Sequence, residues 1–313
     1  MEESYRSRYE KHKRKRKRRQ MRIAFVLLIP VLIIGAILFW PSADPEVPEV
    51  EEYENGEPYT TEINIGLNTA VLTISVPLSE LTDTYFLELI NLWNPIRREP
   101  DISTFVTVWP DISVLSSDLI LHESARTALG DWFHRAEAEG VTADFFLTHG
   151  YRSNEYQAAL YDITADSDLV KPPGHSEHHT GLAIDISLPD VSAAEMKTLP
   201  EFLWLAETAW EHGFILRYPD GMSHITGIGF EPWHFRYVGN PHAFYMHTNN
   251  LVLEEYIDHL IRQGVLSITV EGRRYEVWHQ MPYNDMIYIP ESLPFSVSND
   301  NMGGYIVTVE ITS

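Results

Sequence analysis

The sequence predicts an α+β fold, and three stretches of the chain support this prediction. Apolar residues recur with helical spacing over 123–139, and they alternate with polar or small residues over 182–188, as in a strand. After residue 265 come four short runs rich in β-branched and aromatic residues, which are typical of strands. Between residues 58 and 313 we therefore expect one α+β domain with additions at both ends.

Composition limits the classes of protein to which this chain can belong. It has 313 residues, 44% of them hydrophobic, which is enough to build a substantial core. It has no cysteine, which excludes disulfides, thiolate metal sites and cysteine nucleophiles. The net charge is −22, and residues 41–313 contain 12 Lys and Arg against 42 Asp and Glu. So acidic a body argues against binding to a nucleic-acid backbone.

The amino terminus is predicted to anchor the chain in a membrane. Residues 23–40 carry no charge, and a helix of this length spans ~27 Å, about the thickness of the hydrocarbon core. The preceding basic tail, residues 1–22, places the amino terminus in the cytoplasm by the positive-inside rule. A cleaved secretory signal is the alternative, and both interpretations put the rest of the chain outside the membrane. Residues 41–58 are acidic and rich in proline, as in an extended linker.

The first half of the domain is expected to contain strands on both sides of one long helix. Alternating apolar residues predict one or two strands within 60–76. The helix over 123–139 should stop at Gly140, because glycine favours the backbone conformation that ends helices. A buried strand over 145–147 follows, and then a short helix that begins at residue 153 or 154.

The second half is expected to change from helices to strands. A capping-box pattern at its start predicts a helix over 192–213, and a strand follows over 214–217. Asn240-Pro241 is typical of a helix start, and helical periodicity then continues with interruptions to residue 263. Four strands are predicted at 266–270, 274–280, 286–290 and 305–311.

The run from His175 to Asp185 contains a candidate metal site. The apolar residues of the strand over 182–188 share one face, so Asp185 lies on the opposite face. Gly181 allows the chain to bend, which would bring a histidine from 175–179 back over this carboxylate.

Glu231 and His234 form a second candidate cluster. The two residues are three positions apart, so in one straight strand their side chains would point to opposite faces. They can converge only if the chain turns at Pro232, and proline favours such a turn. Two histidines, an aspartate and a free glutamate are what a catalytic zinc site needs: three ligands, an open position for water, and a base. The alternative is structural, with hydrogen-bonded imidazoles and a carboxylate that caps a turn. Spacing alone leaves both interpretations open.

These motifs resemble the zinc signature of one peptidase family. Ser176-x-His178-x-x-Gly181-x-Ala183-x-Asp185, followed by Glu231-x-x-His234, is similar to the signature of VanY-like D-alanyl-D-alanine carboxypeptidases. This family shares its fold with D-Ala-D-Ala dipeptidases and hedgehog-like domains. The resemblance extends over residues 87–239, and further matching motifs lie at 150–153, 172–174 and 213–219.

The resemblance implies a role for each matching residue. His178, Asp185 and His234 would bind one Zn²⁺, and Glu231 would be the general base and acid. The terminal carboxylate of the substrate would bind Arg152, in a pocket also lined by Gln157 and Ser176. Arg217 and Arg236 are expected to be structural. His175 and His179 depart from the usual family pattern, and they are the alternatives to His178 as the histidine ligand.

The implied protein is a membrane-anchored zinc carboxypeptidase that removes the terminal D-alanine from peptidoglycan stem peptides outside the cell. One alternative is an L,D-carboxypeptidase acting on tetrapeptide stems, and another is a non-catalytic wall-binding protein. The chain would then comprise a cytoplasmic tail (1–22), a transmembrane helix (23–40), a linker (41–58), a zinc carboxypeptidase domain (59–250, core 87–240) and a helix with a β-rich extension (251–313).

Overall fold

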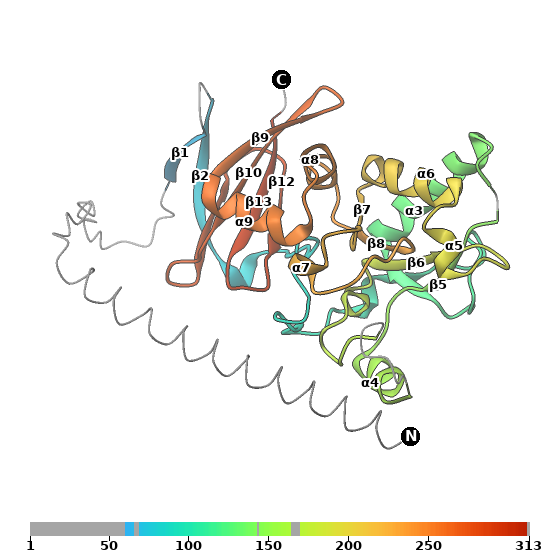
Figure 1. The fold of residues 1–313 in the computed structure, drawn as a ribbon. Helices are drawn as coiled ribbons and strands as arrows, with labels where there is room; N and C mark the ends of the chain where they lie inside the picture. Colours follow the sequence, from blue (N-terminus) through green and yellow to red (C-terminus); the bar gives the residue numbers. More distant parts are fainter. Residues whose placement is uncertain (1–59, 66–68, 143, 164–169, 312–313) are drawn as a thin grey trace, which may run out of the picture. The chain divides into compact units, whose positions relative to one another are not determined.

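The computed structural model describes residues 60–65, 69–142, 144–163 and 170–311. The predicted cytoplasmic tail, transmembrane helix and linker lie outside these described residues. None of the helices within the described ranges has the length and apolar character that a membrane crossing needs. The described residues belong to one compact unit, Glu57–Ser313, in which a mixed α/β part and a β-rich part can be followed in Figure 1.

A four-stranded antiparallel sheet forms the centre of the α/β part, in the order β5-β6-β8-β7. Helices α3 (Glu123–Ala138) and α6 (Pro200–Thr208) cover one face, where Trp132 and Phe202 share a core with Ile184 and Phe235. Because strand side chains alternate, the residues next to Ile184 and Phe235 point to the opposite face. The strands are β5 (Phe146–His149), β6 (Ala183–Ser187), β7 (Phe214–Leu216) and β8 (His234–Tyr237).

The helix predicted over 123–139 is confirmed by α3. Gly140, just after the helix, has the left-handed backbone conformation (φ 71°) that commonly ends helices. The single helix predicted over 192–213 is wrong. That segment forms α5 (Ala193–Met196), α6 and a 3₁₀ turn, η4 (Ala209–His212). Pro200 separates α5 from α6 because it lacks an amide hydrogen and restricts the residue before it. The predicted capping box, between Ser192 and Glu195, is present at the start of α5.

Shorter elements surround the central sheet. The short helix predicted after residue 153 is α4 (Asn154–Ile163), and a two-stranded sheet of β3 (Phe105–Thr107) and β4 (Ile120–His122) precedes α3. The predicted helical stretch up to residue 263 consists of α8 (His242–Asn249) and α9 (Leu253–Gln263). The remaining short helices are η1 (Leu78–Glu80), η2 (Ile102–Thr104), η3 (Glu177–Thr180) and α7 (Ser223–Thr226).

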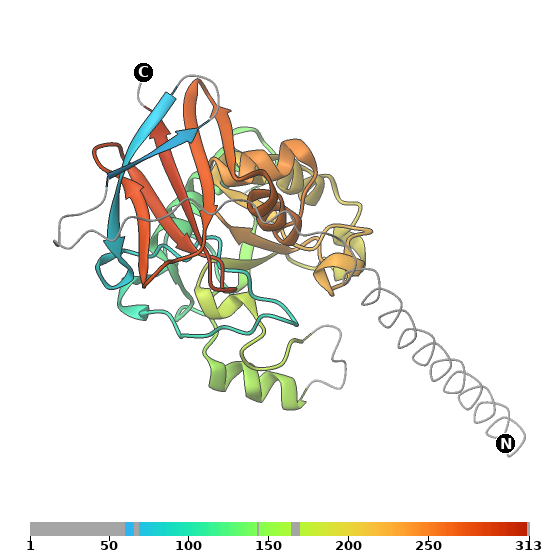
Figure 2. The ribbon, with the colours of Figure 1, turned by 90° about the vertical axis from the view of Figure 1, so that its left-hand side faces the viewer.

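The β-rich part consists of two sheets, which Figure 2 shows from the side of β1 and β2. One has the order β12-β13-β10-β9 and the other β1-β2-β11, and residues from both form one apolar core. The first sheet contains β9 (Val265–Val270), β10 (Arg273–Gln280), β12 (Phe295–Asn299) and β13 (Tyr305–Ile311). The second contains β1 (Thr60–Ile65), β2 (Thr69–Pro77) and β11 (Met286–Pro290).

Two features of the β-rich part differ from the sequence-based expectation. The strands β1 and β2, expected within the catalytic domain, instead pair with β11 near the carboxyl end. A fifth strand, β12, was not predicted, because its Phe-Ser-Val-Ser-Asn sequence has only two apolar residues. The other four strands confirm the prediction for the region after residue 265.

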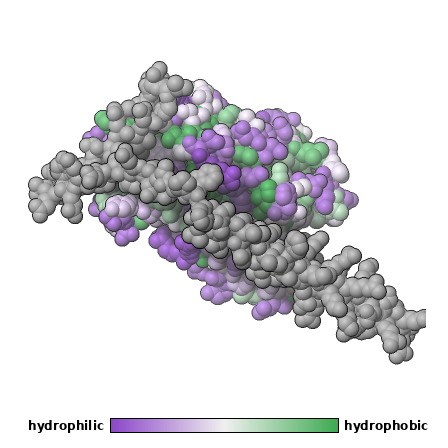
Figure 3. Space-filling view, turned by 60° about the vertical axis from the view of Figure 1, so that its left-hand side comes forward, coloured by the Kyte–Doolittle hydropathy of each residue, from purple (hydrophilic) through white to green (hydrophobic). Residues whose placement is uncertain are grey.

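Helix α9 joins the β-rich part to the α/β part. Its buried residues Tyr256 and Ile257 belong to a core that includes Val277 of β10 and Ile306 of β13, and also Ile215 of β7. The carboxyl-terminal extension is therefore packed against the central sheet rather than appended to it. On the face shown in Figure 3, where grey atoms do not cover it, hydrophobic residues lie scattered among hydrophilic ones.

Candidate active site

Asp185 and His234 meet on the polar face of the central sheet. They are directly opposite each other in the antiparallel pairing of β6 with β8. Asp185 Oδ1 lies 2.8 Å from Nδ1 of His234, and both side chains are buried. The hydrogen bonds of the sheet therefore fix the separation of the two residues.

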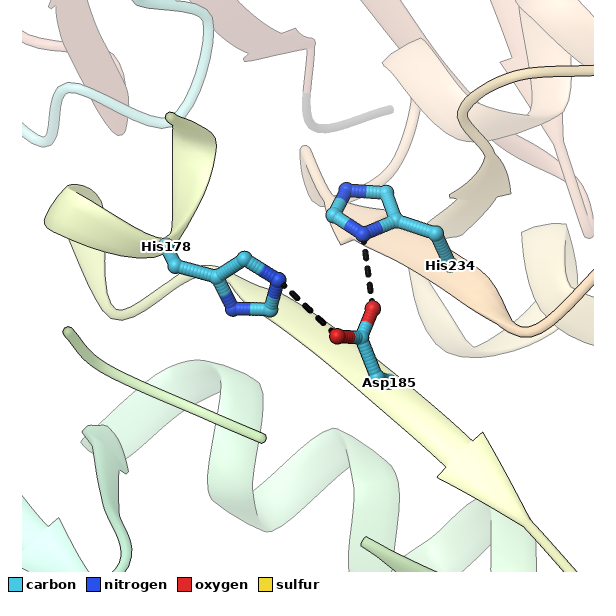
Figure 4. A group of neighbouring side chains, drawn as sticks. All are labelled: His178, Asp185 and His234. Carbon is cyan, nitrogen blue, oxygen red and sulfur yellow. Dashed lines mark hydrogen bonds and ion pairs between the residues drawn. The ribbon is translucent and has the colours of Figure 1, made fainter. Parts of the chain in front are cut away.

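His178 approaches the same carboxylate from η3. Gly181 ends this turn in the left-handed conformation (φ 67°), and a Cβ there would lie 2.4 Å from the ring of Phe105. The bend predicted at Gly181 is thus present. His178 Nδ1 lies 2.7 Å from the Gly150 carbonyl oxygen, which accepts a hydrogen bond when Nδ1 carries the proton. Nε2 is then free, and it lies 3.3 Å from Asp185 Oδ2 (Figure 4).

The three side chains form a group that fits a metal ion. One ligand atom from each of His178, Asp185 and His234 lies within 4.8 Å of the others, and all three residues are buried. Nε2 of His178 is a buried nitrogen without a hydrogen-bond partner among the described residues. Two imidazole nitrogens and one carboxylate oxygen are a donor set that suits Zn²⁺.

The neighbouring histidines have other partners. His179 Nδ1 lies 2.8 Å from the Arg152 carbonyl oxygen, and its Nε2 accepts a hydrogen bond from the Gly174 amide at 3.1 Å. His175 Nδ1 lies 2.9 Å from the Asn91 carbonyl oxygen. The structure therefore brings His178, and neither of these two, to Asp185.

One histidine at this site escaped the sequence analysis. His149 Nδ1 lies 3.1 Å from Asp185 Oδ2, and the two residues are partners in the pairing of β5 with β6. Its side chain is partly exposed. The spacing of residues along the chain does not point to His149. Only the pairing of the strand over 145–147 with the strand over 182–188 places His149 next to Asp185.

Glu231 lies just before the strand that carries His234. The His234 amide donates to the Glu231 carbonyl oxygen at 3.2 Å, which closes the turn predicted at Pro232. Glu231 is 9% exposed, and burial raises the pKa of its carboxyl to about 7, although the charge of His234 opposes this shift. A carboxyl group with a pKa near neutrality can both accept and donate a proton.

Arg152 extends beside this group from the segment between β5 and α4. Its Nη1 donates to Gln157 Oε1 at 3.0 Å, and Nη2 donates to Asp185 Oδ2 at 3.4 Å. Gln157 is fixed in turn, because its Nε2 donates to the Lys171 carbonyl oxygen at 2.7 Å. Ser176, the third residue expected in the substrate pocket, is buried at the start of η3.

The pKa values of the three side chains follow from burial and from the contacts between them. Burial would raise the pKa of Asp185, but the imidazoles that face it, those of His178, His149 and His234, hold it well below its usual value. Burial lowers the pKa of His178 to about 3, so this imidazole is neutral. His234 is also buried, yet its contacts with Asp185 and Glu177 raise its pKa to about 9.

Comparison with known proteins identifies relatives of this chain. The VanY family model, described as D-alanyl-D-alanine carboxypeptidase, matches residues 118–240. A D-alanyl-D-alanine carboxypeptidase of Enterococcus faecium is 36% identical over 230 residues, which cover 71% of this chain and 74% of the relative.

Solved structures show the same similarity. The vancomycin-resistance D,D-dipeptidase VanXYg, solved with a D-Ala-D-Ala phosphinate analogue, is 28% identical with a TM-score of 0.66, covering 76% of this chain and 98% of that one. A mutant of the D,D-pentapeptidase VanY from the VanB-type resistance cassette was solved with Zn(II) and is 32% identical with a TM-score of 0.47. The match covers 55% of this chain and 99% of that one.

Proposed function

The chain belongs to the VanY family of D-alanyl-D-alanine carboxypeptidases, and we propose that it removes the terminal D-alanine from peptidoglycan stem peptides. The observation that carries this proposal is the buried group of His178, Asp185 and His234, together with the buried Glu231, whose carboxyl interacts with the charges of His234 and Asp185. These residues supply a metal site and a proton-transfer group, which are the two parts that hydrolysis of a peptide bond by this route requires.

The cofactor of this proposal is Zn²⁺, held by His178, Asp185 and His234. Bound zinc supplies a Lewis acid, which polarises a carbonyl group and lowers the pKa of water. The donor set favours zinc, because two imidazole nitrogens and one carboxylate oxygen match its preference for nitrogen and oxygen ligands.

Glu231 moves the proton in the proposed reaction. Its carboxylate accepts a proton from the water that attacks the last peptide bond, and the resulting carboxylic acid donates it to the departing amine of D-alanine. A pKa raised towards 7 by burial suits both steps, since the group then exchanges its proton readily near neutral pH.

Arg152 binds the terminal carboxylate of the substrate. Its guanidinium group offers two parallel donors and keeps its charge even when mostly shielded from water, as this one is, with 11% of its side chain exposed. Gln157 accepts a hydrogen bond from the guanidinium and thereby orients it, and Gln157 and Ser176 would line the same pocket as Arg152. A carboxypeptidase needs such a cation because the free carboxylate distinguishes the chain end from an internal peptide bond.

We also propose that the enzyme is a single-pass membrane protein with its catalytic domain outside the cell. The support is the uncharged stretch 23–40 behind the basic residues 11–19. The proposed substrate is a component of the cell wall, on the side of the membrane where this orientation places the catalytic domain.

The proposed activity is tested by mass spectrometry of stem peptides incubated with the full chain. A pentapeptide ending in D-Ala-D-Ala should lose one alanine, and a metal chelator should abolish this loss. Cleavage of the tetrapeptide alone would favour the L,D-carboxypeptidase instead. A folded, zinc-loaded protein that cleaves neither peptide would favour the wall-binding alternative.

A further inference from the structure

A buried group of charged side chains lies behind His234, on the side away from Asp185. Its central member is Glu177, whose side chain is fully buried. Glu177 Oε1 accepts hydrogen bonds from Arg217 Nε at 2.8 Å and from Arg236 Nη1 at 2.9 Å. Glu177 Oε2 faces His234 Nε2 at 3.6 Å. Neither of these last two atoms has a hydrogen-bond partner among the described residues.

This group extends to the carboxyl-terminal part of the chain. Arg217 donates from Nη1 and Nη2 to the two carboxylate oxygens of Glu254, at 2.9 and 2.7 Å. Glu254 lies in α9, beyond the residues that the family model matches. Asn91 also donates to Glu254, at 3.1 Å. A continuous series of contacts, Glu254–Arg217–Glu177–His234, therefore connects α9 to the candidate metal site.

The position of Glu177 selects which nitrogen of His234 can bind a metal. A neutral imidazole carries its proton on one nitrogen and has a free electron pair on the other. A carboxylate beside Nε2 favours the proton there, and Nδ1, which faces Asp185, is then free to be a ligand. Metal-binding histidines commonly direct their second nitrogen to a carboxylate, which fixes the ring orientation.

The two arginines fix Glu177 in turn. Arg236 also donates to the carbonyl oxygens of Phe86 and Glu88, at 3.1 Å each, so its guanidinium cannot rotate freely. The bidentate contact with Glu254 likewise restricts the rotation of the Arg217 guanidinium. Two glutamates and two arginines balance in charge, and removal of one member would leave an uncompensated charge in the interior.

We infer that Glu177 and Glu254 are positioning residues for the metal ligand His234, and that α9 is thereby a functional part of the metal site. This inference rests on the proposed metal site. It assigns a role to the carboxyl-terminal extension, because the extension supplies Glu254 to a series of contacts that ends at a ligand.

The test is the Zn²⁺ affinity of the folded full chain, measured by competition with a chelator. Glu177→Gln should bind Zn²⁺ roughly 10- to 100-fold more weakly than the wild type, and Glu254→Gln roughly 3- to 10-fold more weakly. Asp258→Asn is the matched control, since Asp258 lies on the same helix and also pairs with an arginine, Arg262, but is exposed. It should bind Zn²⁺ as the wild type does.

A second measurement separates positioning from simple stabilisation. In the zinc-loaded wild type, the Nε2 proton of His234 should give a slowly exchanging imidazole N–H signal in NMR spectra, and this signal should weaken in Glu177→Gln. Arg217→Lys keeps the charge but loses the bidentate contact, so it should weaken Zn²⁺ binding even if Glu254→Gln does not fold.

The outcomes are distinguishable. Equal Zn²⁺ affinity in the wild type, Glu254→Gln and Arg217→Lys would overturn the inference, and a lowered melting temperature alone would make α9 a purely structural element. If the wild type itself bound no Zn²⁺, the proposed function would fail together with this inference.

Discussion

Asp185 and His234 are direct partners across β6 and β8, with 2.8 Å between Asp185 Oδ1 and His234 Nδ1. Two of the three candidate ligands thus lie on strands whose backbones are hydrogen-bonded to each other. The third, His178, is oriented by the Gly150 carbonyl oxygen. Ligands fixed in this way lose little conformational freedom on binding a metal, which favours tight binding.

Glu231→Gln should retain zinc and lose most of its activity. The amide has the shape of the carboxylate but cannot accept a proton from water, so kcat should fall about 10²- to 10⁴-fold. Steady-state kinetics and the zinc content of the purified protein check this. Glu137→Gln, at an exposed position of α3, is the control. Undiminished kcat in Glu231→Gln would remove Glu231 from the mechanism.

His178→Ala and His179→Ala should have different effects on metal binding. His178→Ala removes a ligand, so the protein should lose its zinc. His179→Ala should keep it, because both ring nitrogens of His179 contact backbone atoms, at Arg152 and Gly174. Its expected defect is a higher KM, since Arg152 loses a contact that holds its backbone. Metal analysis of both variants decides the matter, and the reverse pattern would mean that His179 is the ligand.

The chemistry of the site could largely be predicted from local sequence. The alternation around Asp185, the bend at Gly181 and the turn at Pro232 are short-range features, and all three are present in the structure. His149 could not be found in this way, because its contact with Asp185 depends on the pairing of two strands. The partners of Glu177 lie 40 and 59 residues away, so no local pattern reveals them.

The pairing of strands in the fold likewise could not be predicted from local sequence. Most helices and strands could be placed from periodicity, but strand pairing could not. Ile74 of β2 pairs with Ile289 of β11, and these two strands come from opposite ends of the described chain. Nothing in either strand distinguishes this pairing from pairing with the central sheet, because both strands simply present apolar residues to a core.

The dependence of activity on pH should report the titration of Glu231. Burial raises its pKa to about 7, and a bound dication would lower this value. A general base must be deprotonated, so kcat/KM should rise with pH through this pKa and level off at or below about pH 7. Glu231→Gln should lack this rise in its residual activity. A wild-type profile that is flat between about pH 5 and 7 would contradict the assignment.

Glu88 should make the protein less stable as the pH rises. It is 8% exposed, and burial raises its pKa from 4.5 to about 7. The protonated form therefore stabilises the folded state fully below pH 4.5, and this contribution is lost as the pH rises to about 7. At about pH 8, Glu88→Gln should exceed the wild type in free energy of unfolding by ~1–3 kcal/mol, and at about pH 4 the two should agree. Urea unfolding at both pH values measures this, with the exposed Glu99→Gln as the control.

Arg152→Lys should weaken substrate binding through the loss of one specific contact. Lysine keeps the positive charge but not the planar pair of donors, and a hydrogen bond to a charged group contributes about 1.5–3 kcal/mol, so KM should rise roughly 10- to 100-fold. A pentapeptide with an amidated carboxyl terminus tests the partner of this contact. The wild type should lose a similar factor in kcat/KM with the amide, whereas Arg152→Lys should lose little more than it has already lost. If the two losses multiplied instead, Arg152 and the terminal carboxylate would act independently, and the carboxylate would have to bind another cation of the site.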